Sequence, residues 1–237
     1  MIYVYYGSLI ILIPGILLSI YANFRINSTF KKYSKVSTQK GFKASDVAKM
    51  LLYNKNCNDV SVEKISGKLT DNFNPSNNIL SLSDSTYNSD SVAAIGVAAH
   101  EVGHACQHND GYFMMKLRSF LVPAVNIGST LAFPLAILGV FIEWFSATMF
   151  GPILIVMGII LYSLSFVFSF ITLPTELNAS KRAKQMLYEY GFVTKQEQKQ
   201  VGSVLYAAAL TYFASLIVSF LYLLRFIVII ASLRRKD

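Results

Sequence analysis

Long apolar stretches alternate with polar ones along this chain. The first, residues 3–22, contains no charged residue, and at 1.5 Å per residue a helix of this length extends about 30 Å, the thickness of a bilayer's hydrocarbon core. Residues 120–142 and 151–173 are also uncharged, and a short turn around Glu143 and Trp144 is expected between them. The pattern therefore predicts at least three transmembrane helices.

The first and last apolar stretches each leave an alternative to weigh. A cleaved signal peptide requires basic residues at its start, but no Lys or Arg precedes Arg25, so we expect an uncleaved helix that Pro14 and Gly15 kink. The last stretch, residues 203–233, is interrupted by Arg225. It can cross the membrane, re-enter it or break at Arg225, and the sequence leaves the number of helices at three or four.

The two polar segments, residues 23–119 and 174–202, have compositions that can fold in water. Amphipathic spacing, alternation and turn residues predict secondary structure in the first of them. Asn88 to Ser91 supply capping side chains just before the second expected helix. The expected elements are helices at 45–52 and 92–108 and strands at 59–65 and 79–83.

Composition agrees with a membrane protein. Hydrophobic residues make up 54% of the chain and charged residues 14%, against about a quarter in soluble domains, which excludes intrinsic disorder. With two cysteines, Cys57 and Cys106, a disulfide scaffold is also excluded.

The basic residues indicate topology. The chain carries a net charge of +8, and 17 of its 21 Lys and Arg lie in the two polar segments. Positively charged loops stay in the cytoplasm, so both polar segments are expected there and the N-terminus outside. Membrane topology accounts for the basic charge, and no nucleic-acid partner is expected.

The chemistry is predicted in the helix expected at 92–108. His100 and His104 are four residues apart, so both imidazoles lie on one helix face and can bind one metal ion. Glu101 can act as general base on a water activated by that metal. Nitrogen and oxygen ligands at an open tetrahedral site favour zinc.

The HExxH pattern is specific. With three His and six Glu in 237 residues, a chance occurrence has a probability of about one in a thousand. The alternative is a pair of helix histidines that only make hydrogen bonds in the core. Because the pattern falls inside a capped helix, we favour the metal site.

Zinc needs a third protein ligand. His108 rises about 6 Å beyond His104 on a straight helix, too far to bind the same ion, so a surface or supporting role is expected for it. No other histidine exists, which leaves a carboxylate. Glu176 is preferred, directly after an apolar stretch and in a helix that Pro174 is expected to begin; alternatively it is only a first-turn acid. Glu189 and Glu197 are weaker candidates.

These residues carry a resemblance that extends over nearly the whole chain. The sequence resembles the YugP-type family of neutral zinc metallopeptidases of bacterial membranes, and more distantly the HtpX-like membrane peptidases. The resemblance implies zinc ligands at His100, His104 and Glu176 and a catalytic glutamate at Glu101. The matching blocks are 71–75 (DNFNP), 80–83 (LSLS), 87–89 (YNS), 92–105 (VAAIGVAAHEVGHA), 173–176 (LPTE) and 179–183 (ASKRA).

The chain departs from the HtpX-like pattern in two places. Ser180 stands where that pattern has a supporting aspartate, so Asn178 or Ser180 is expected to orient a ligand histidine instead. A further histidine that stabilises the oxyanion is also missing, so Tyr206, Tyr212 or an arginine has to replace it.

The expected strand at 79–83 has two interpretations. As an exposed edge strand it could align a peptide substrate by adding a strand to the sheet. As an ordinary strand it would only pack on the helix that carries HExxH. The sequence does not decide between the two.

The sequence thus predicts a multi-pass protein of a bacterial cell membrane, mainly α-helical, with a small α+β, zincin-like catalytic domain in the cytoplasm. Its expected function is zinc-dependent hydrolysis of peptides or proteins, membrane proteins included. The alternative is a non-proteolytic membrane scaffold or adaptor that binds zinc. The oligomeric state stays open. The segments are 1–22 (membrane), 23–119 (catalytic), 120–173 (two membrane helices), 174–202 (third ligand) and 203–237 (membrane and basic tail).

Overall fold

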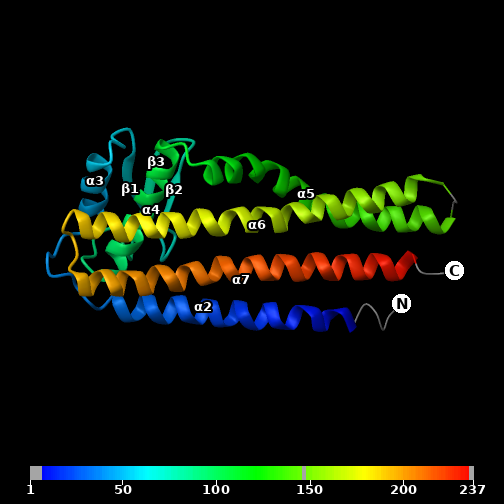
Figure 1. Ribbon diagram of the computed structural model, residues 1–237, viewed down its shortest axis with the longest axis horizontal. Helices are drawn as coiled ribbons and strands as arrows, with labels where there is room; N and C mark the ends of the chain where they lie inside the picture. Colours follow the sequence, from blue (N-terminus) through cyan, green and yellow to red (C-terminus); the bar gives the residue numbers. More distant parts are fainter. Residues whose placement is uncertain (1–6, 146–147, 235–237) are drawn as a thin grey trace. The chain divides into compact units, whose positions relative to one another are not determined.

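A computed structural model describes residues 7–145 and 148–234, and these residues are mainly helical (Figure 1). The strand predicted at 79–83 has the same bounds in the structure, and the helices predicted at 45–52 and 92–108 are confirmed to within two residues. The helices are η1 Ser8–Leu12, α2 Ile13–Tyr33, α3 Ala44–Asn54, α4 Val92–Asn109, α5 Phe113–Phe145, α6 Phe150–Glu189 and α7 Lys195–Arg234, and the strands are β1 Ser61–Ile65, β2 Asn72–Asn74 and β3 Ile79–Ser83.

Four of the helices that the structure describes are long and apolar enough to cross a membrane: Ser8–Tyr33, α5, α6 and α7. The prediction of an integral membrane protein agrees with this count. The first four residues of the predicted span at 3–22 lie outside the described residues. The last apolar stretch does not break at Arg225, because α7 continues as one helix to Arg234.

Two predicted helix boundaries are wrong. No helix begins at Pro174, which lies inside α6. Proline removes one backbone hydrogen bond, but a long helix tolerates this when packing holds the residues around it, and Thr175 and Glu176 are buried. No turn occurs at Glu143 and Trp144, where α5 continues to Phe145, because neither side chain has the backbone preferences that end a helix.

The described part of the chain divides into two compact units. The first contains the described residues within the ranges Met1–Tyr21, Leu117–Leu173 and Tyr212–Asp237. In it α5 and α6 approach closely: a Cβ added at Gly158 would lie 2.7 Å from the backbone oxygen of Ala132. Small residues at such contacts are typical of helix pairs in membranes.

The second unit comprises Ala22–Lys116 and Pro174–Thr211. Its sheet has the order β1-β3-β2, with β1 parallel and β2 antiparallel to β3. Leu80 and Leu82 of β3 are fully buried and belong to the same apolar cluster as α3 and α4. Since β3 lies between two strands, the interpretation of residues 79–83 as an exposed edge strand is wrong; β1 and β2 form the edges.

Helix α4 begins where the polar segment before it supplies a cap. The Ser91 side chain accepts a hydrogen bond from the backbone N–H of Ala94, which satisfies one of the free donors at the helix start. Most of α4 is buried, and its small residues allow other elements to approach closely. At Gly103 an added Cβ would lie 2.7 Å from the backbone oxygen of Ala179 on α6.

The contact at Gly103 generates the first prediction. A Gly103→Ala substitution places a methyl group against the backbone of α6, so the helices must separate, at an expected loss of about 1–3 kcal/mol in the free energy of unfolding. The matched control is Gly96→Ala on the same helix, whose methyl group would meet the side chain of Val201, with the nearest atom at 3.1 Å, and no backbone atom among its nearest neighbours. Thermal unfolding in detergent should show a lower midpoint for Gly103→Ala than for Gly96→Ala; equal midpoints would contradict the argument.

Candidate metal centre

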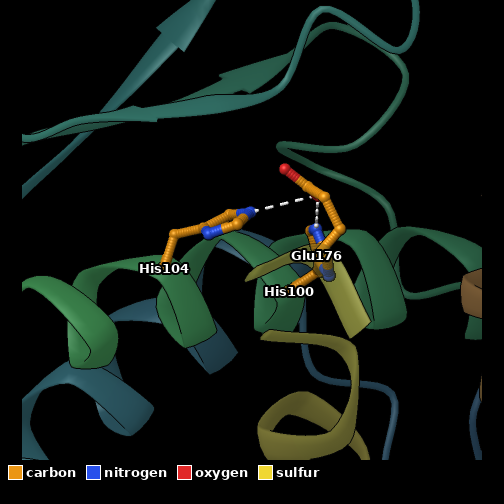
Figure 2. Close-up of side chains that lie close together, drawn as sticks. All are labelled: His100, His104 and Glu176. Atoms are coloured by element: carbon orange, nitrogen blue, oxygen red, sulfur yellow. Dashed lines mark hydrogen bonds and ion pairs between the residues drawn. The ribbon is translucent and has the colours of Figure 1, made fainter. Parts of the chain in front are cut away.

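The two histidines of α4 and one glutamate of α6 face one another. His100 and His104 are one helical turn apart, with ring centroids separated by 4.7 Å. Oε2 of Glu176 lies 3.2 Å from Nε2 of His100 and 3.4 Å from Nε2 of His104. Figure 2 shows the carboxylate turned toward both imidazoles.

This arrangement fits a zinc ion. The three ligand atoms all lie within 4.8 Å of one another. In a tetrahedral site with bonds of about 2.1 Å, two ligand atoms lie about 3.4 Å apart, and both separations from the Glu176 carboxylate agree with that value. Two nitrogen ligands and one oxygen ligand suit zinc and leave its fourth position open.

Burial makes the charges at this site significant. Only 2% of the Glu176 side chain is exposed, and a buried carboxylate needs cationic or hydrogen-bonding partners. Burial disfavours the charged form of His104, but the Glu176 carboxylate, together with Glu101 and Gln107, outweighs this effect and raises the pKa of His104. The site therefore favours positive charge beside Glu176, whether from a proton or from a metal ion.

Glu101 is buried beside these residues without joining them. Its burial raises the pKa of its carboxyl group, and the nearby His100 and His104 act in the opposite direction. Among the described residues, the group that can hold a metal consists of His100, His104 and Glu176. Glu101 is thus close enough to these three residues to interact with them electrostatically, but it is not one of the candidate ligands.

Two polar side chains contact the Nδ1 atoms of the histidines, on the ring edge away from Glu176. Ser180 Oγ lies 3.2 Å from Nδ1 of His100, and Oε1 of Gln107 lies 2.9 Å from Nδ1 of His104. Ser180 was one of two candidates for such a role, and Asn178, the other, contacts Gln107. Gln107 is not among the residues that the sequence pattern predicts for the site; its signal is its position three residues after His104, on the same helix face.

The other residues considered for the site lie elsewhere. The His108 side chain is exposed, with its ring centroid 6.0 Å from that of Phe73. Glu189 is exposed and accepts a hydrogen bond from Gln185 of its own helix. Glu197 accepts hydrogen bonds from the backbone N–H groups of residues 39 and 194 at the start of α7. None of the three joins the group of ligand atoms.

The sequence pattern of one protein family, described as "Putative neutral zinc metallopeptidase", matches residues 8–231. The chain belongs to this family. A relative in Bacillus subtilis (strain 168), "Putative membrane protease YugP", is 42% identical over 221 residues, which cover 93% of this chain and 95% of the relative. No solved structure matches the chain.

Membership of this zinc metallopeptidase family agrees with the chemistry of the site. The family name implies zinc, and the two imidazoles and one carboxylate are ligands that zinc prefers. The relative's name and the four apolar helices both indicate a membrane protein. The individual roles of His100, Glu101, His104 and Glu176 stay predictions.

The site predicts that Glu176→Gln loses zinc. The amide keeps the size of the side chain but removes the negative charge that attracts the cation, so we expect zinc affinity to fall by at least about 100-fold. The matched control is Glu189→Gln, an exposed position on the same helix. Competition with a chromophoric chelator measures both affinities; a Glu176→Gln protein that binds zinc like its control contradicts this ligand assignment.

Proposed function

We propose that this chain is a zinc-dependent endopeptidase of the cell membrane. The observation that carries the proposal is that Glu101 lies close enough to His100, His104 and Glu176 to interact with them electrostatically. Three protein ligands would leave the fourth position of a zinc ion open. A structural zinc site closes its coordination shell with four protein ligands and needs no neighbouring base. The family membership and the name of the relative support a protease.

In the proposed mechanism, His100, His104 and Glu176 hold the zinc ion. When bound, zinc polarises the scissile carbonyl and lowers the pKa of a water molecule. The Glu101 carboxylate would accept a proton from a water molecule whose oxygen bonds to the scissile carbonyl carbon. The same carboxyl group would then donate this proton to the amine nitrogen as the C–N bond breaks.

A zincin-like arrangement is part of the proposal. Helix α4 with its HExxH residues packs in one apolar cluster with β3 and α3, as expected for a catalytic helix supported by a small sheet. The expected substrates are peptides or proteins, membrane proteins included. A nucleic-acid partner is still not expected, because membrane topology accounts for the basic charge.

The proposed location of the active site is the cytoplasm. Both polar segments are basic, and positively charged loops stay on the cytoplasmic side. The connection between α5 and α6 contains no Lys or Arg, as expected for a loop on the outer side. With four crossings, however, the basic residues that end the chain lie outside, against the usual charge distribution.

The proposal predicts that Glu101→Gln binds zinc and does not cleave. The amide cannot accept the proton from water, so we expect casein cleavage by the purified protein to fall by at least about 100-fold. Zinc content should stay stoichiometric, because Glu101 is outside the ligand group. His104→Ala, by contrast, should lose both zinc and cleavage.

Two outcomes would count against the proposal. An unchanged cleavage rate in Glu101→Gln would falsify the role of Glu101 as the general base. Stoichiometric zinc in the wild type, with no cleavage of any tested protein, would instead favour the scaffold or adaptor.

The topology can be tested with single cysteines at exposed positions. Ser66 precedes the tight turn after β1, and Thr148 lies in the connection between α5 and α6; both are exposed, whereas the native Cys57 and Cys106 are buried. In intact cells, an impermeant maleimide should label Thr148→Cys and leave Ser66→Cys unlabelled until the membrane is made permeable. The reverse pattern would place the active site outside.

A further inference from the structure

Gln107 is a fully buried polar side chain on α4. Its oxygen Oε1 lies 2.9 Å from Nδ1 of His104. Its nitrogen Nε2 donates to the backbone oxygen of Thr175 at 2.8 Å and to Oδ1 of Asn178 at 3.0 Å. One amide group thus contacts a ligand histidine on α4 and two residues of α6 that flank Glu176.

The partners determine which way the Gln107 amide points. The backbone oxygen of Thr175 can only accept a hydrogen bond, so the NH₂ group of Gln107 must face it. Asn178 agrees, because its Oδ1 also accepts from Nε of Arg182, which can only donate. The carbonyl oxygen of Gln107 therefore faces His104.

This orientation determines the tautomer of His104. An amide oxygen can only accept, so Nδ1 of His104 must carry the proton. When the imidazole is neutral, its lone pair is then on Nε2, the atom that faces Glu176 at 3.4 Å. Nε2 is the atom through which His104 would bind zinc, so the hydrogen bond prepares the ring in the form that a metal needs.

We propose that Gln107 is a positioning residue of the zinc site. It holds His104 in its ligand form and ties the ring to the turn of α6 that presents Glu176. In this role it acts through His104. The inference rests on the proposed zinc site and adds to it the group that orients one ligand.

Two variants test the role of the Gln107 oxygen. Gln107→Met keeps the side-chain length and removes the acceptor for His104, so zinc affinity should fall about 10- to 100-fold. Gln107→Glu keeps an acceptor for His104 but turns a second oxygen toward the acceptors of Thr175 and Asn178, so part of the affinity should return while the unfolding temperature falls. The absorption bands of bound Co²⁺ should change in Gln107→Met and resemble the wild type in Gln107→Glu.

A third variant tests whether Gln107 orients His104 or only stabilises the packing of α4 against α6. Asn178→Ala removes one hydrogen bond between the helices and leaves the contact of Gln107 with His104 in place. It should lower the unfolding temperature and keep the zinc affinity of the wild type. Loss of affinity in Asn178→Ala equal to that in Gln107→Met overturns the inference, as does wild-type affinity in Gln107→Met.

The readouts also distinguish this inference from the proposed function. If the wild type binds no zinc, both the proposed function and the role of Gln107 are contradicted. If the wild type binds zinc and cleaves casein while Gln107→Met binds zinc equally well, only the role of Gln107 fails. If the wild type binds zinc without cleaving and Gln107→Met binds it weakly, the positioning role stands and the peptidase proposal fails.

Discussion

The close contact between α4 and α6 is the constraint on which the site depends. The candidate ligands come from two helices that are distant in the sequence, and the close approach of these helices requires that Gly103 has no side chain where the backbone of Ala179 passes. Three residues before Ala179, Glu176 then lies between His100 and His104. Gly103, a variable position of the HExxH motif that has no reactive group, thus determines how closely Glu176 can approach the two histidines.

The buried charges at this contact require hydrogen-bonding partners. A carboxylate and two imidazoles are brought together with little access to water, where unpaired charge is costly. The arrangement is stable only if each group has a defined partner: Glu176 faces both rings, Ser180 lies behind His100, and Gln107 holds His104. The same bonds that satisfy the buried groups also aim three ligand atoms at one point, as expected for a binding site prepared in advance.

Local patterns predicted part of this arrangement, and contacts between distant segments decided the rest. The spacing of His100 and His104 within a helix is a local property, and β3 has the bounds that its sequence predicts. The place of β3 between two other strands depends on pairing, which alternation does not reveal. Pro174 was misjudged because a local rule for helix starts was outweighed by packing. Gln107 was missed because its role depends on which atoms of α6 face α4.

The central claim is that His100, His104 and Glu176 hold one zinc ion with an open fourth position. X-ray absorption at the zinc edge of the purified protein, compared between wild type and Glu176→Gln, tests this claim most directly. The account predicts two imidazole nitrogens and one carboxylate oxygen at about 2.0–2.2 Å, with a light atom from solvent as the fourth neighbour, and loss of this shell in the variant. A zinc–sulfur distance of about 2.3 Å, or a shell that Glu176→Gln leaves unchanged, would contradict it.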